Sequence, residues 1–124
     1  MTMTSKKVLD SYALIEISNA NPKFNHLING DFEIPNIIMA EFWGLLFRKY
    51  NKETADFWLE RCIGNCVPVN LDTHVKAREF KLINKRKNFS LIDSIGYMHA
   101  RDKGYIFVTG DKEFENLEGV EYIK

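Results

Sequence analysis

Short apolar runs alternate with longer segments of helical periodicity along the chain. Runs of strand length occupy residues 7–10, 33–35, 66–70, 105–108 and 120–123, and the one over 105–108 is the clearest. The spacing of apolar side chains predicts helices over residues 12–19, 24–29, 36–50, 52–63, 72–87, 90–103 and 112–117. This alternation predicts an α/β fold in which helices cover both faces of a mainly parallel sheet.

The length and composition indicate one globular domain. The chain has 124 residues, enough for a single core, and we expect one domain over 6–124 after a flexible N-terminus at 1–5. Hydrophobic residues make up 45% and charged residues 27%, which argues against disorder. No secretion signal is recognisable, and the longest apolar stretch, 37–47, falls short of the ~20 residues that span a bilayer. We therefore expect a cytoplasmic protein that does not associate with membranes.

Basic and acidic residues number 17 each, so the chain has no overall positive field to attract nucleic acid. A local concentration of cations covers one predicted helix and the loop after it: Lys76, Arg78, Lys81, Lys85, Arg86 and Lys87. The sequence leaves open whether these residues form a solvated helix face or contact phosphates. Cys62 and Cys66 lack the second ligand pair of a zinc site, and the sequence does not decide whether they pair.

Two acidic residues follow predicted strands. Asp10 ends the first strand, and Asp111 comes shortly after the strand over 105–108. The carboxyl ends of parallel strands meet at one edge of a sheet, where active sites form, so we expect both carboxylates to face the same cleft. Each could instead cap the helix that follows it.

Two further acids lie in predicted helices. Glu41 shares a helix face with Ile37, Ile38 and Leu45, and burying an unpaired carboxylate there is costly unless it meets a cation. Asp93 stands three residues after a serine, in the Ser-x-x-Asp pattern of a helix cap. The helix N-terminus also stabilises a charged carboxylate, so capping and metal binding are compatible.

The order of these features resembles the PIN domain, and in particular the VapC-type toxin nucleases of toxin-antitoxin pairs. The resemblance covers nearly the whole chain. It rests on the segments VLDSYALIEI, MAEFWGLL, SLIDSIGYMHARDKG, YIFVTGDKEF and GVEYIK. It implies a three-layer α/β/α fold whose sheet has about five strands in the order 3-2-1-4-5.

The resemblance also assigns a metal site. It implies that catalysis and binding of Mg²⁺ or Mn²⁺ rest on four carboxylates, those of Asp10, Glu41, Asp93 and Asp111. Supporting positions would be taken by Ser11, Thr109 and Glu113. The implied reaction is hydrolysis of RNA phosphodiesters to leave a 5′-phosphate and a 3′-hydroxyl. The implied partners are a VapB-type antitoxin and a second copy of the chain, with Trp43 and Phe47 as interface candidates.

Other functions remain open at this point. One is a PIN nuclease of RNA processing or decay that has no antitoxin, and another is a non-catalytic nucleic-acid-binding module on the same scaffold. A phosphoryl-accepting Asp10 is disfavoured because no second aspartate follows two residues later. Metal-free cleavage by His26, His74 or His99 is also disfavoured, since nothing in the sequence brings two of them together.

Overall fold

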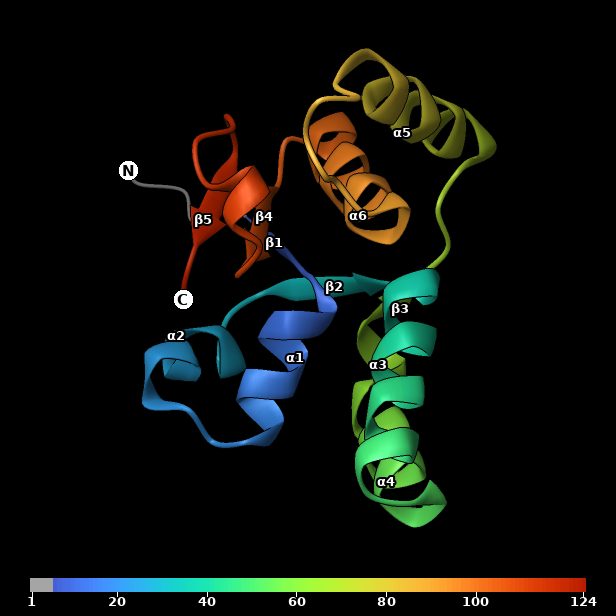
Figure 1. Cartoon of the computed structure of the whole chain (residues 1–124). Helices are drawn as coiled ribbons and strands as arrows, with labels where there is room; N and C mark the ends of the chain where they lie inside the picture. The colour runs from blue at the N-terminus through green and yellow to red at the C-terminus, as the bar shows by residue number, and fades with distance from the viewer. Residues whose placement is uncertain (1–5) are drawn as a thin grey trace.

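The computed structural model describes residues 6–124, and the N-terminal segment 1–5, predicted to be flexible, lies outside the described residues. One sheet of parallel strands has the predicted order, β3-β2-β1-β4-β5 (Figure 1). The strands are β1 (Lys7–Leu9), β2 (Phe32–Pro35), β3 (Cys66–Val67), β4 (Ile106–Thr109) and β5 (Val120–Tyr122). Leu9 lies opposite Val108, so the residues after β1 and β4 emerge side by side at one edge.

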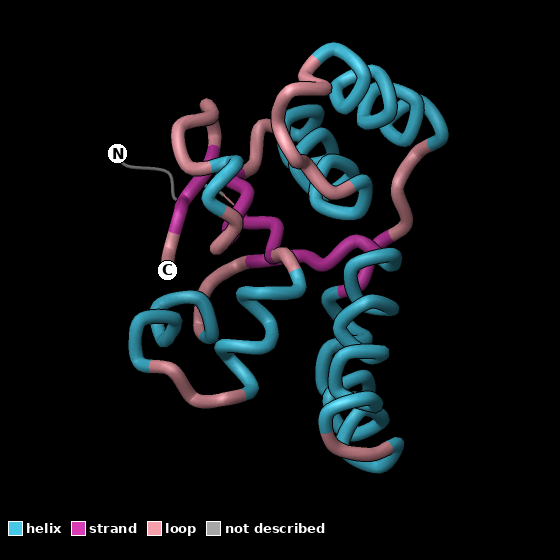
Figure 2. The backbone as a smooth tube through the Cα atoms, viewed as in Figure 1, coloured by secondary structure: helices cyan, strands magenta, loops and turns pink. Residues whose placement is uncertain are grey.

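Helices cover both faces of this sheet and complete the predicted three layers (Figure 1). One layer contains α1 (Ser11–Ser18), α2 (Asn25–Ile28), α3 (Asn36–Lys49) and α4 (Lys52–Cys62), and the other contains α5 (Leu71–Ile83) and α6 (Leu91–Lys103). Three single 3₁₀ turns complete the elements: η1 (Pro22–Phe24), η2 (Ile63–Asn65) and η3 (Lys112–Phe114). In Figure 2 the short strands cross the middle of the molecule, and α3 and α4 project together away from them.

The core lies between the central strands and the two helical layers. On the α5–α6 side it contains a cluster of aromatic rings whose neighbouring centroids are 4.6–6.5 Å apart, formed by Phe80, Phe89, Tyr97, Phe107 and Phe114. Each large apolar side chain buried in this way contributes about 1.5–3 kcal/mol. The cluster fixes η3 and the loop before α6 beside β4.

Some element boundaries differ from those predicted. The predicted strand over 66–70 is only two residues long, because Pro68 cannot donate a backbone hydrogen bond to a neighbouring strand. The helix predicted over 72–87 ends at Ile83, and the helix predicted over 112–117 is the single turn η3. Gly104 ends α6 as expected, with a left-handed φ of 71°. Across residues 6–124, no helix combines the length and apolarity needed to cross a membrane.

Candidate functional site

Asp10 connects β1 to α1 and is almost completely buried, with 2% of its surface exposed. Its Oδ1 accepts a 2.7 Å hydrogen bond from the Ala13 N–H and so caps α1. Burial raises the pKa of Asp10 to about 6, although hydrogen bonds from Thr109 and the Gly110 N–H favour the charged form. The charge of Asp111 raises this pKa further. Asp10 therefore caps α1 and also places at the sheet edge a carboxyl group whose charged form is destabilised by burial.

Asp111 lies in the turn that follows β4, the strand that pairs with β1. Its backbone N–H donates to Thr109 Oγ1 at 3.0 Å, and its own Oδ1 accepts from the Glu113 N–H at 3.0 Å. The turn is tight at Gly110, where an added Cβ would come within 2.2 Å of the Tyr12 ring. The capping role that the sequence allowed for Asp111 is present, and the residue still lies close enough to Asp10 to affect its pKa.

Asp93 lies in the first turn of α6, where Ser90 Oγ accepts a 3.0 Å hydrogen bond from its N–H. Burial raises the pKa of Asp93 to about 7, and the charges of Asp10, Asp111 and Glu41 act in the same direction. A side-chain hydrogen bond with Ser90 acts in the opposite direction. Asp10, Glu41 and Asp111 thus lie near enough to Asp93 to raise its pKa, and the four acids are called the carboxylate cluster here. They come from the end of β1, from α3, from α6 and from the turn after β4.

Glu41 reaches this cluster from the middle of α3. The hydroxyl of Ser11 donates a hydrogen bond of 2.5 Å to Glu41 Oε1, which joins the start of α1 to α3. Glu41 is only half-buried, which is less burial than the apolar spacing of this helix predicted. The Ser11 hydroxyl gives this carboxylate a polar partner within the described residues.

The donor set suits a hard divalent cation, because Mg²⁺ and Mn²⁺ prefer carboxylate oxygens and water. Within residues 6–124, however, no three His, Cys, Asp or Glu side chains converge tightly enough to form a ready-made metal site. Among the supporting residues, Ser11 and Thr109 bind the acids directly, whereas Glu113 Oε2 lies 3.9 Å from Lys87 Nζ.

The histidines lie in other parts of the fold. His99 is buried and its Nε2 lies 2.7 Å from Glu33 Oε1, while His26 contacts Glu121 on β5 at 2.6 Å. Burial alone would raise the pKa of Glu33, but the hydrogen bond with His99 and the charges of Lys103 and His99 lower it. This buried pair was not predicted. The one signal for it in the sequence is an acidic residue inside the apolar strand FEIP.

The two interface candidates on α3 have different environments. Their rings stack, with centroids 5.3 Å apart, but the Trp43 indole N–H donates to Asp56 Oδ1 on α4 at 3.0 Å. Phe47 is 50% exposed. Trp43 therefore fastens α3 to α4, and Phe47 is the more accessible of the two.

A second surface feature is a groove of about 290 Å³ between α1, α2 and α4. Its walls are mostly apolar and include Leu14, Ile17, Ile28 and Trp58, with Arg61 as a charged lining residue. The sequence did not indicate this groove, because its walls come from α1, α2, α3 and α4 together with β2 and η2, whose relative positions depend on the fold. A groove with this lining suits an apolar segment that carries an acidic group.

The fold and site define a three-layer α/β domain with an acidic centre at the carboxyl edge of its sheet. Residues 7–120 match the model of the PIN domain, so the chain belongs to the PIN domain family. None of the curated proteins compared with the chain matches it.

Solved structures with the same fold share little sequence with the chain. VapC20 of Mycobacterium tuberculosis, a toxin that cleaves the Sarcin-Ricin loop, is 18% identical with a TM-score of 0.80, over 95% of this chain and 99% of that one. VapBC2 of Rickettsia felis, bound to a promoter DNA fragment, is 19% identical with a TM-score of 0.75, over 96% and 99%. DNA-bound VapBC of Salmonella typhimurium is 19% identical with a TM-score of 0.74, over 97% and 98%.

Proposed function

We propose that this chain is a metal-dependent endoribonuclease, the VapC-like toxin of a type II toxin-antitoxin pair. The observation that carries the proposal is the position of four carboxylates at the carboxyl edge of the sheet, where burial and the charges of the other three acids raise the pKa of Asp93. Buried carboxylates with raised pKa values, such as Asp10 and Asp93, cluster at functional sites, where burial and neighbouring charges tune an acid for its task. The family membership and the fold shared with VapC toxins point to the same chemistry.

The metal would be held by Asp10, Glu41, Asp93 and Asp111. A bound Mg²⁺ or Mn²⁺ supplies positive charge that offsets the phosphodiester and lowers the pKa of a coordinated water. The chain's own polar groups orient the carboxylates for this task. The Ser11 hydroxyl fixes one oxygen of Glu41, and the Ala13 N–H fixes Oδ1 of Asp10.

Cleavage assays with a matched pair of variants test this proposal. The purified chain is incubated with single-stranded and structured RNA in Mg²⁺, Mn²⁺ or EDTA, alongside Asp10→Asn and Asp31→Asn. Asp31 is a suitable control because it precedes β2 at the opposite edge of the sheet and its side chain is 77% exposed. We expect metal-dependent cleavage that Asp10→Asn loses and Asp31→Asn retains. Cleavage in EDTA, or equal activity of Asp10→Asn and the wild type, would contradict the proposed site.

For the antitoxin, we propose that the groove between α1, α2 and α4 receives an apolar segment. VapB partners are named in three of the structures that share this fold. Expression of the chain alone should then arrest growth, and co-expression of a small protein encoded beside it should restore growth. Ile17→Asp, at the groove wall, should keep the nuclease activity but abolish the rescue. A toxic chain that no neighbouring gene product neutralises would favour a role in RNA processing or decay.

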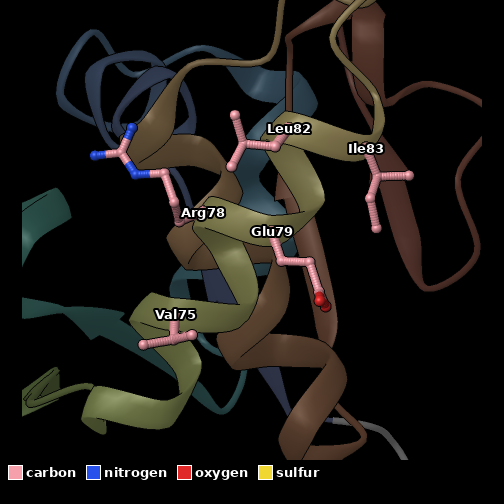
Figure 3. A pocket seen from close by; sticks show the side chains of 5 residues that line it. All are labelled: Val75, Arg78, Glu79, Leu82 and Ile83. Atoms are coloured by element: carbon pink, nitrogen blue, oxygen red, sulfur yellow. The ribbon is translucent and has the colours of Figure 1, made fainter.

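A homodimer is the remaining partner proposal, and Phe47 remains a candidate contact. The structure adds a second candidate surface on α5, whose outer side bears four exposed apolar residues: Leu71 (77%), Val75 (60%), Leu82 (67%) and Ile83 (73%). Figure 3 shows three of them beside Arg78 and Glu79. Patches of this kind on one helix commonly mark protein contacts. Light scattering on the wild type, Phe47→Lys and Leu82→Lys would identify the surface used, and a monomeric wild type would contradict the dimer.

A further inference from the structure

Aromatic packing holds the loop between α5 and α6 against η3. Phe89 in this loop is buried, and its ring centroid lies 4.6 Å from that of Phe114 in η3. Lys81 Nζ donates to the Phe89 carbonyl at 2.8 Å, and the Lys87 N–H donates to the Asn84 carbonyl at 2.9 Å. The loop is therefore a fixed part of the site's surroundings.

Three consecutive cations project from this loop. Lys85, Arg86 and Lys87 are all exposed. In the part of the chain that the structure describes, neither Lys85 nor Arg86 has an acidic side chain within ion-pair distance, and Lys87 has only Glu113, at 3.9 Å. In a chain with equal numbers of acidic and basic residues, this is a local excess of positive charge.

The excess charge lies beside the carboxylates. Lys87 contacts the side chain of Glu113, whose backbone N–H binds the Asp111 carboxylate, and the loop leads directly to Ser90, which caps the helix carrying Asp93. Within the described residues, Lys85 and Arg86 form no ion pair with these carboxylates, and both side chains are exposed to solvent. They are free to bind an anion that arrives with the substrate.

We propose that Lys85, Arg86 and Lys87 bind backbone phosphates of the RNA strand next to the cleaved bond, and so set where the strand lies across the carboxylates. This inference rests on the proposed nuclease function. Phosphate contacts fix the register of a nucleic acid without reading its sequence, which suits exposed, flexible cations. The competing role is local: cations at the C-terminal end of α5 favour its helix dipole. That role predicts an effect on stability and none on RNA binding.

The test compares two triple variants that remove the same charge. One is Lys85→Gln with Arg86→Gln and Lys87→Gln, and the control neutralises Arg48, Lys49 and Lys52 at the far tip of α3 and α4. Both are made in the wild type and in an Asp93→Asn background, where RNA binding is measured in EDTA without cleavage. The salt dependence of binding reports the number of phosphate contacts, at about 0.7 in log–log slope for each contact with a single strand.

We expect the loop variant to bind RNA at least tenfold more weakly and to lose about two units of salt slope, whereas the control changes binding less than twofold. In the cleaving background, KM should rise with little change in kcat. Equal losses in both variants, an unchanged slope, or a change confined to thermal stability would overturn the inference. If the wild type shows no metal-dependent cleavage, the proposed function itself fails, whereas normal cleavage with normal binding by the loop variant refutes only the role of the loop.

Discussion

Removing one charge from the carboxylate cluster should stabilise the metal-free protein. Asp93→Asn keeps the size and hydrogen-bonding capacity of the side chain but cannot ionise. Burial and three neighbouring acids shift the pKa of Asp93 from 3.8 to about 7. Such a shift corresponds to roughly 4 kcal/mol of destabilisation at a pH above both values. The side chain is partly accessible to solvent, so we expect about half of this, ~2 kcal/mol.

The pH dependence has a definite sign. A carboxyl group with a raised folded-state pKa binds its proton more tightly in the folded protein than in the unfolded chain. The stability it contributes is therefore fully present below about pH 4 and is lost as the pH rises through about 7. Asp10 acts in the same direction, since its pKa is raised to about 6. Between pH 5.5 and 8 the free energy of unfolding of the wild type should fall by ~1–2 kcal/mol, and that of Asp93→Asn should fall by less.

Thermal and urea unfolding in EDTA at pH 5.5 and pH 8 measure both effects. At pH 8 Asp93→Asn should melt about 6–10 °C above the wild type, and Asp31→Asn should stay within ~0.5 kcal/mol of it. Mg²⁺ should then stabilise the wild type more than the variant, because binding to the folded state adds stability. An Asp93→Asn protein less stable than the wild type at pH 8, or a wild type whose stability is flat with pH, would refute the reasoning.

Three further predictions concern single contacts. Ser11→Ala removes the hydrogen bond to Glu41, so cleavage should fall about tenfold and require more Mg²⁺, and an unchanged metal titration would contradict this role. Glu33→Gln breaks the buried pair with His99 and should lower the free energy of unfolding by ~3 kcal/mol at pH 7 without a loss of kcat. Because the pKa of Glu33 is depressed, the difference should shrink as the pH falls through that lowered pKa, which urea unfolding at several acidic pH values would measure. Gly110→Ala forces a methyl group against the Tyr12 ring, so calorimetry should show a loss of ~1–3 kcal/mol in the free energy of unfolding. Cleavage by this variant should also be reduced.

The strand-end acids were predictable because their position follows from chain direction alone. Asp10 and Asp111 end neighbouring parallel strands, so any parallel sheet that pairs those strands brings them together. Asp93 was predictable from the serine that caps its helix. The sequence order was sufficient in these cases because each acid lies at the boundary of an element.

Residues inside elements were harder to place. The apolar neighbours of Glu41 suggested a buried carboxylate, but the orientation of α3 leaves it half exposed beside Ser11. The pair of Glu33 and His99 joins residues far apart in sequence, and only the packing of α6 on the sheet brings them within 2.7 Å. The exposed apolar side of α5 could not be predicted from the sequence either, since the periodicity of this helix did not indicate which side faces the core.

The strand order 3-2-1-4-5 has a consequence for how such a site tolerates change. After β1 the chain turns into α1 on one face of the sheet, whereas after β4 it turns into η3, whose Phe114 packs in the aromatic cluster on the opposite face. The two chain directions diverge at this point, which is the place where open parallel sheets commonly bind their ligands. The positions of Asp10 and Asp111 depend only on the first residues of each exit, and the loops that border this edge are free to diverge. A scaffold of this kind can therefore change the loops around the edge while these two carboxylates stay in place.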